Sequence, residues 1–129
     1  MSASVSAAAK PATVFVVDDE PLLLELAALT IEPLGYQVRT FVDPETALRE
    51  FSADRPDLVI TDYAMGRMSG MDLIRECRRL NPDQKIILIS GTVDEYVFAD
   101  ARVLPNRFIG KPYQLSDFSN CIAEVLAQK

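Results

Sequence analysis

The stretch Val14-Phe15-Val16-Val17-Asp18-Asp19-Glu20 decides the fold of this chain. Its first four residues form a continuous apolar run, mostly of β-branched side chains, which is typical of a strand buried on both faces of a parallel sheet. Three acidic residues follow at once, and Pro21 then opens a segment with helical signals. We therefore predict a buried strand that carries carboxylates to the start of a helix.

The same order, a short apolar run followed by a helical segment, recurs along the whole chain. The other runs predicted to be strands are 36–41, 57–61, 86–89 and 107–109, and the segments predicted to be helices are 20–32, 44–53, 69–80, 92–103 and 114–128. The run 36–41 alternates apolar with polar side chains, which suits an edge strand. Parallel strands joined by helices require right-handed crossovers and helices on both faces of the sheet. The sequence thus predicts an α/β fold, a (βα)5 doubly wound parallel sheet of five strands in the order 2-1-3-4-5.

Apolar spacing within the helical segments predicts which faces are buried. Leu22, Leu26 and Leu29 share one face of the segment 20–32, so we expect this face to pack on the sheet. The segment 114–128 has a longer stripe, which is formed by Leu115, Phe118, Ile122, Val125 and Leu126.

Length and composition indicate one globular domain. The chain has 129 residues, 49% of them apolar and 25% charged, which is ordinary for one compact domain. Residues 1–12 are small and mostly polar, and we expect a flexible tail before a domain at 13–129. The formal charge of −6 argues against a nucleic-acid partner, because phosphate binding starts from a basic surface. Neither a signal peptide nor an apolar run of membrane-spanning length occurs, so we expect a cytoplasmic protein with no membrane partner.

The contents of histidine and cysteine exclude several kinds of site. The chain has no histidine, which excludes histidine-based catalysis, histidine metal ligands and a phosphohistidine carrier. Cys77 and Cys121 show neither the density of a disulfide framework nor the clustering of a zinc site. We expect both to be buried free thiols.

Reactive or charged side chains follow four of the five predicted strands. Asp18 and Asp19 follow the first strand, Asp62 the third, Ser90 the fourth and Lys111 the fifth. In a sheet of the order 2-1-3-4-5 the carboxyl ends of these strands meet at one edge, where ligands bind. We therefore expect the five side chains to converge on one cleft. The second strand is followed only by Asp43-Pro44, which a helix cap explains.

These residue types favour phosphoryl transfer. Close carboxylates repel one another unless a cation lies between them, and an oxygen-only site suits Mg²⁺ or Mn²⁺ but not zinc. Lys111 adds a positive charge, and Ser90 adds a hydroxyl donor. Asp62 would be the acceptor, with an acyl phosphate as the product. Each residue alone has an ordinary explanation as a helix cap or a turn, so only their joint occurrence indicates this chemistry.

Four motifs of the chain resemble the receiver domains of two-component response regulators, which have a flavodoxin-like fold. They are VFVVDDE at 14–20, LVITDYAMGRMSGMDLI at 58–74, ILISGT at 87–92 and RFIGKPY at 107–113, and the resemblance extends over 13–128. It implies that Asp62 is the phosphoacceptor. It also implies that Asp19 binds Mg²⁺ directly, Asp18 binds it largely through water, and the backbone carbonyl of Ala64 is a further ligand.

The resemblance further implies a switch. Ser90 would hydrogen-bond the phosphoryl group, Lys111 would pair with it, and the bond to Pro112 would be cis. Phe108 falls at the family's aromatic switch position, and we expect its ring to face inward even without phosphate, since it has no hydroxyl to bury. Phosphorylation would then repack one surface of the protein. This surface is formed by the predicted helix at 92–103, the strand at 107–109 and the helix at 114–128.

The resemblance implies a phosphorelay protein rather than an enzyme with an external substrate, because only its own phosphorylation and dephosphorylation would be catalysed. The expected donor is a histidine kinase or a histidine phosphotransfer protein, and the expected target is a downstream protein. The chain would be a monomer or a phosphorylation-dependent dimer. The initiating Met and the end at Lys129 favour a complete single-domain protein, with a receiver excised from a hybrid kinase or a larger effector as the alternative.

Two other classes of protein could use a similar fold or site. A phosphatase of the haloacid dehalogenase type needs a second aspartate two residues after the nucleophile, where this chain has Ala64. A flavin or nucleotide binder needs a phosphate loop after the first strand, where this chain has three acids.

The chain departs from the receiver pattern at two places. Gly66 replaces the proline that commonly follows Met65, so we expect a more mobile loop at 64–69. Pro105 stands where the family usually has a small residue, and we expect it to end the helix at 92–103 early. Phe98 lies off the apolar stripe of that helix, where it either packs internally or contacts a partner.

Overall fold

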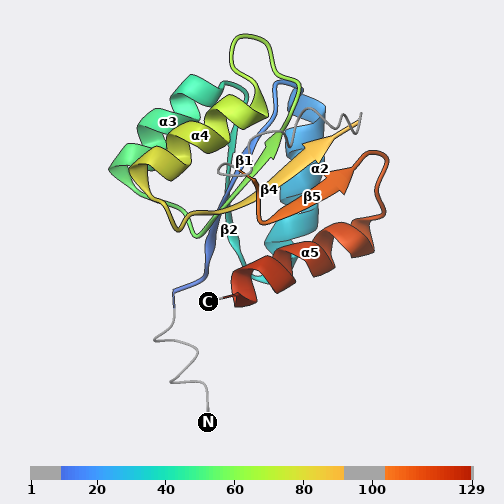
Figure 1. Cartoon of the computed structure of the whole chain (residues 1–129). Coiled ribbons are helices and arrows are strands. Elements are labelled where there is room, and N and C mark those ends of the chain that lie inside the picture. Colours follow the sequence, from blue (N-terminus) through green and yellow to red (C-terminus); the bar gives the residue numbers. More distant parts are fainter. Residues whose placement is uncertain (1–9, 92–103, 129) are drawn as a thin grey trace.

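Five parallel strands form the centre of the molecule in the computed structural model, which describes residues 10–91 and 104–128 (Figure 1). The elements are β1 (Thr13–Val17), α2 (Pro21–Ile31), the 3₁₀ helix η1 (Glu32–Leu34), β2 (Gln37–Phe41), α3 (Pro44–Ala53), β3 (Leu58–Asp62), α4 (Gly70–Leu80), β4 (Lys85–Ser90), β5 (Arg107–Gly110) and α5 (Leu115–Ala127). The strand order is β2-β1-β3-β4-β5, which confirms the predicted α/β fold. The helix predicted at 92–103, with Phe98, and residues 1–9 of the predicted tail lie outside the described residues.

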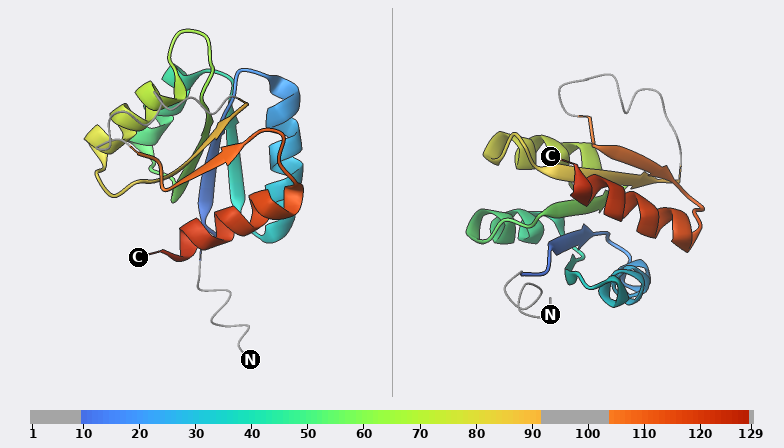
Figure 2. Two further views of the ribbon diagram at one scale, coloured as in Figure 1. Left: turned by 45° about the vertical axis from the view of Figure 1, so that its right-hand side comes forward. Right: turned by 90° about the horizontal axis from the view of Figure 1, so that it is seen from below.

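Helices cover both faces of the sheet, α3 and α4 on one face and α2 and α5 on the other (Figure 2). Alternate side chains of each central strand enter the two resulting cores. In β1, Phe15 and Val17 belong to the core under α3 and α4, whereas Val14 and Val16 belong to the core under α2 and α5. Because both faces are covered, these strands are apolar along most of their length, as the continuous runs predicted.

The buried face of α2 is not the predicted one. Leu24, Ala27 and Ile31 are buried, whereas Leu22, Leu26 and Leu29 are 78%, 45% and 65% exposed. A helix with leucine on all sides has little amphipathic contrast, so the spacing of its apolar residues does not identify the inner face. The prediction for this helix was therefore wrong, and it leaves a leucine stripe on the surface.

The other helix faces follow the predictions more closely. In α5 the predicted residues Phe118, Ile122 and Val125 are buried, but Leu115, the first residue of the helix, is 48% exposed. The two cysteines are free and buried, as predicted. Among the described residues no helix is long and apolar enough to cross a membrane.

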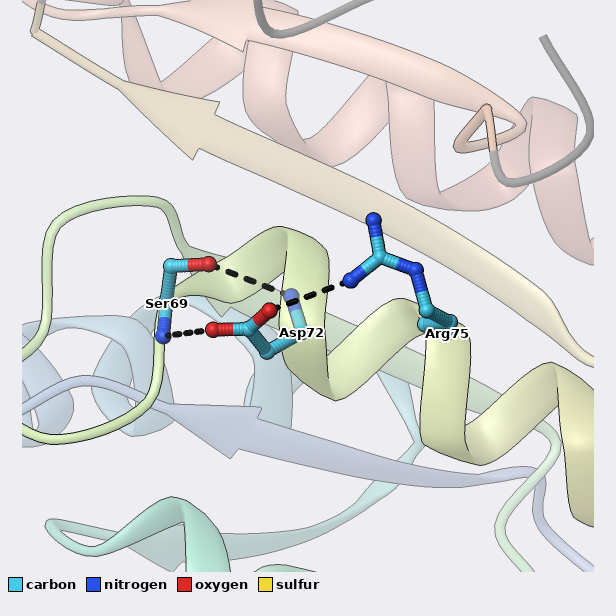
Figure 3. A network of polar contacts seen from close by, with 3 residues as sticks. All are labelled: Ser69, Asp72 and Arg75. Atoms are coloured by element: carbon cyan, nitrogen blue, oxygen red, sulfur yellow. Dashed lines mark hydrogen bonds and ion pairs between the residues drawn. The ribbon is translucent and has the colours of Figure 1, made fainter. Parts of the chain in front are cut away.

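Polar side chains fix the start of the helices that flank the acceptor strand. In α4, Ser69 Oγ accepts from the Asp72 N–H at 3.1 Å, and Asp72 Oδ2 accepts from the Ser69 N–H at 3.1 Å (Figure 3). Asp72 also pairs with Arg75, at 3.1 Å. In α3, Asp43 Oδ1 accepts from the Glu45 N–H, so Asp43 is the cap that the sequence predicted. Such caps satisfy the free N–H groups of the first turn and hold each helix in position.

The strand β3 starts one residue later than predicted and includes Asp62. Asp57 stays outside the strand because it binds the start of β1: its Oδ2 accepts from the Thr13 N–H at 2.8 Å. The shift places Asp62 in the last position of a strand that is buried along its whole length.

Candidate functional site

Asp62 and Lys111 meet at the carboxyl edge of the sheet. The Nζ of Lys111 lies 2.9 Å from Oδ1 of Asp62, and the side chain of Asp62 is only 9% exposed. Lys111 reaches this position from the end of β5, where its N–H donates to the Ser90 carbonyl at 2.8 Å and its bond to Pro112 is cis, as the resemblance implied. The structure therefore brings together two of the predicted site residues in a direct ion pair.

Three acidic residues cluster at the end of β1. Ligand oxygens of Asp18, Asp19 and Glu20 all lie within 4.8 Å of one another. Asp18 is buried and accepts from the Glu20 N–H at 2.9 Å, whereas Asp19 and Glu20 are exposed. The sequence predicted a metal site with Asp18 and Asp19 but not with Glu20. The structure adds Glu20 to this cluster.

The charges of the site affect one another. Burial raises the pKa of Asp18, and the nearby charges of Asp62 and Asp19 raise it further, against the lowering effects of the Glu20 N–H and of Lys111. Burial lowers the pKa of Lys111, but the hydrogen bond and charge of Asp62, together with the charges of Asp18 and Glu20, outweigh it, so that the pKa is raised. Lys111 is therefore a firmly protonated cation beside carboxylates that repel one another.

The donor set fits a hard divalent cation. It consists of carboxylate oxygens, without the nitrogen or sulfur ligands that zinc prefers. Burial is the main cause of the raised pKa of Asp18, and the charges of Asp62 and Asp19 add a repulsion that a bound cation would relieve. Ala64, the predicted carbonyl ligand, is exposed in the loop after Asp62.

That loop is held at both ends. The Tyr63 N–H donates to the Ile89 carbonyl and the Gly70 N–H to the Tyr63 carbonyl, both at 2.8 Å. A Cβ on Gly70 would collide with the backbone oxygen of Asp62 and lie 2.8 Å from Leu88 Cδ1, so only glycine allows α4 to begin this close to the acceptor strand. Nothing in the local sequence around Gly70 indicates this role, because the contacts are with β3 and β4.

Ser90 and Phe108 occupy neighbouring strands beside the ion pair. Ser90 is buried at the end of β4, opposite Gly110 of β5. Phe108 is half-buried and packs against the core under α3 and α4. Its inward position as part of a switch stays a prediction.

Tyr113 is a further residue at the site that the sequence analysis did not single out. Its ring centroid lies 5.1 Å from that of Phe118. Burial raises the pKa of its hydroxyl, while Lys111 lowers it and the charges of Asp18 and Asp62 raise it. The position of Tyr113, two residues after Lys111, could have indicated that it lies at the site, but such a spacing alone is not specific.

Comparison with known proteins identifies the class to which this fold and site belong. The sequence model of the response regulator receiver domain matches residues 14–123, which include β2 to β5 and all of β1 except its first residue. The chain therefore belongs to the response regulator receiver domain family. Members of this family are switches in two-component phosphorelay signalling, which confirms the class predicted from the motifs.

Two curated relatives and one solved structure illustrate the likeness. The chain is 32% identical over 121 residues to the transcriptional regulatory protein GlrR of Escherichia coli, and 32% identical over 124 residues to the sensor kinase CckA of Brucella abortus. Each alignment covers 92% of this chain, but only 27% of GlrR and 13% of CckA. The response regulator TrrA of Thermotoga maritima, solved in complex with Mg²⁺ and BeF, matches with a TM-score of 0.80 at 28% identity, over 88% of this chain and 98% of that chain.

Proposed function

We propose that this protein accepts a phosphoryl group on Asp62 from a histidine kinase or a histidine phosphotransfer protein, and that the modified form controls a protein partner. The observation that carries the proposal is the ion pair of Asp62 with Lys111 at 2.9 Å, at the edge of the sheet where the acidic cluster lies. A carboxylate held beside a cation and beside further acids is arranged for phosphoryl transfer rather than for a merely structural cap.

In the transfer step a carboxylate oxygen of Asp62 forms a bond to phosphorus while the bond from phosphorus to the donor nitrogen breaks. The electron pair of the broken bond stays on the donor imidazole, and a proton already held on its other ring nitrogen, or taken up from water, makes the released histidine neutral. Lys111 already binds Oδ1, so Oδ2 is the oxygen left to attack. The ammonium of Lys111 then compensates the charge of the new phosphoryl oxygens.

The metal proposed for the site is Mg²⁺, with Mn²⁺ as a substitute. Asp18, Asp19 and Asp62, together with the Ala64 carbonyl, are the residues that would hold it. When bound, the ion supplies positive charge that neutralises phosphoryl oxygens and relieves the repulsion among the carboxylates. Glu20 belongs to the same cluster and accounts for part of the negative potential.

The proposed switch begins at Ser90, whose hydroxyl would turn toward the phosphoryl group. Ser90 lies on β4 and Phe108 on β5, which are paired strands, so we propose that a shift at Ser90 reaches the half-buried ring across this strand pair. The partner surface we propose includes β5 and α5, with the predicted helix at 92–103.

The leucine stripe on α2 supports a helical protein as the phosphodonor. Leu22, Leu26 and Leu29 are exposed at spacings of four and three residues, which is the seam of a helix that packs on another helix. Exposed Glu25 and Glu32 flank this seam, so a second copy of the chain would repel it, whereas a helix with Lys or Arg beside its apolar face would complement it. The stripe starts three residues after Asp19, so a helix bound there lies next to the acceptor site.

Incubation with Mg²⁺ and acetyl phosphate, followed by intact-mass measurement, tests the acceptor. We expect the wild type to gain the mass of one phosphoryl group and Asp62→Asn to gain none. Asp57→Asn is the matched control, because Asp57 binds the start of β1 and not the site, and it should be phosphorylated like the wild type. A wild-type chain that stays unmodified, also with beryllofluoride in NMR, would overturn the proposal.

A further inference from the structure

One buried carboxylate oxygen near the site lacks a hydrogen-bond partner. Among the described residues, Glu45 Oε1 is a fully buried side-chain oxygen that accepts no hydrogen bond. Leaving a buried acceptor unpaired costs stability, and the cost is larger for a charged group. Such an atom therefore indicates a missing donor.

Glu45 lines a small cleft between α3 and the loop after Asp62. The cleft has a volume of about 190 Å³ and is lined by Asp19, Val42, Asp43, Pro44, Glu45, Gly66 and Arg67. These residues supply three carboxylates and one guanidinium. The cleft thus holds one cation of its own, on the loop side.

Two of the three carboxylates already have a role. Asp43 caps α3: its Oδ1 accepts from the Glu45 N–H, and its Oδ2 accepts from the Thr46 hydroxyl at 2.8 Å. Asp19 belongs to the acidic cluster that would hold the cation. Glu45 is therefore the carboxylate of this cleft that is left to receive a donor.

Arg67 is the cationic side chain of this cleft. It is exposed, and within the described part of the chain it forms no ion pair. Gly66 precedes it, and a Cβ on Gly66 would meet no atom within 4 Å, so the loop is not braced at this point. Glu45, in contrast, lies in the capped first turn of α3.

We propose that Arg67 is a positioning residue that closes across this cleft onto Glu45 and ties the loop after Asp62 to the start of α3. The tie satisfies the buried oxygen of Glu45 and restrains the loop that carries Ala64. The importance of this ion pair for the acceptor site rests on the proposed function. The ion pair itself does not, because Arg67 and Glu45 would form it in the unphosphorylated protein.

Amide hydrogen exchange of residues 64–69 in the unphosphorylated, metal-free protein tests the proposed ion pair between Arg67 and Glu45. We expect exchange to rise about two- to fivefold in Arg67→Gln, the range that a partly exposed ion pair gives. Glu45→Gln should give the same increase, and the double variant should give no more than either single variant, because one interaction is lost in all three. Arg67→Lys keeps the charge and should retain most of the protection, which distinguishes an ion pair from general damage to the loop.

Arg79→Gln is the matched control, because it breaks an ion pair with Glu76 at 3.0 Å on exposed α4 and should leave the loop unchanged. Unchanged exchange in Arg67→Gln, or additive effects in the double variant, would overturn the proposal. Phosphorylation is not involved in the measurement, so failure of the acceptor reaction and failure of the tie are separate results.

Discussion

The Nζ of Lys111 lies 2.9 Å from Oδ1 of Asp62, although Asp62 ends β3 and Lys111 follows β5, two strands that are not neighbours in the sheet. The strand between them, β4, ends at Ser90, whose carbonyl accepts from the Lys111 N–H. The backbone of β4 thus sets the position from which Lys111 reaches across to the acceptor. Lys111 is therefore placed before any phosphoryl group arrives.

Replacement of Lys111 by methionine should slow phosphorylation by acetyl phosphate about tenfold to a hundredfold, because a preorganised cation no longer compensates the charge on the transferring group. The rate is measured by intact mass over time in excess donor. Lys111→Arg keeps the charge with a different geometry, so its phosphorylation rate should lie between those of the wild type and the methionine variant. A methionine variant as fast as the wild type would show that Lys111 has no part in the transfer.

The substitution Asp18→Asn should stabilise the metal-free protein near neutral pH by about 0.5–2 kcal/mol, the usual gain of one stabilising change. Burial raises the pKa of Asp18 in the folded state, so the folded protein binds a proton there more readily than the unfolded chain does. Stability is therefore lost as pH rises from the ordinary value of 3.8 through the raised pKa, and the loss is complete above it. Urea unfolding of both proteins, near neutral pH and below pH 3.8, measures the difference in their free energies of unfolding. This difference should vanish below pH 3.8. A variant less stable than the wild type near neutral pH would contradict this explanation.

Gly70→Ala should destabilise the fold by about 1–3 kcal/mol, since the added Cβ meets the backbone of the acceptor strand and cannot be relieved by a change of rotamer. Gly66→Ala is the matched control, because its Cβ meets nothing within 4 Å, and it should be neutral or gain about 0.4–1 kcal/mol through the unfolded state. Urea unfolding of the three proteins gives both values. Equal stabilities for the two variants would contradict the close approach of α4 to Asp62.

Leu26→Ala should slow phosphoryl transfer from a histidine kinase or phosphotransfer domain that phosphorylates the wild type, but leave the rate with acetyl phosphate unchanged. Its stability should change by less than about 0.5 kcal/mol, because the side chain lies on the surface. Leu24→Ala, on the buried face of the same helix, should cost about 2–5 kcal/mol. Equal transfer rates from the protein donor to Leu26→Ala and to the wild type would exclude the stripe as a docking surface.

Local patterns in the sequence were sufficient to predict the strands and most helices. Buried strands of a doubly wound sheet are apolar on both sides, so runs such as 14–17 and 86–89 are distinct from everything around them. The cap at Asp43 was equally readable, because it satisfies an N–H group only two residues away. The strand order 2-1-3-4-5 was predicted as part of the doubly wound fold, and the structure has this order.

The inner face of α2, the fit of Gly70 against Asp62 and the pairing of Lys111 with Asp62 were decided by the tertiary structure. Each depends on distances between segments that are remote in the chain, and sequence spacing carries no information about such distances. For α2 the leucines surround the helix, so only its packing on β1 and β2 selects Leu24 over Leu26 for burial. The sequence by itself determined which chemical groups stand at the strand ends, because local composition sets where strands stop. The packed sheet determined which of those groups touch, because contact requires the register and spacing of all five strands together.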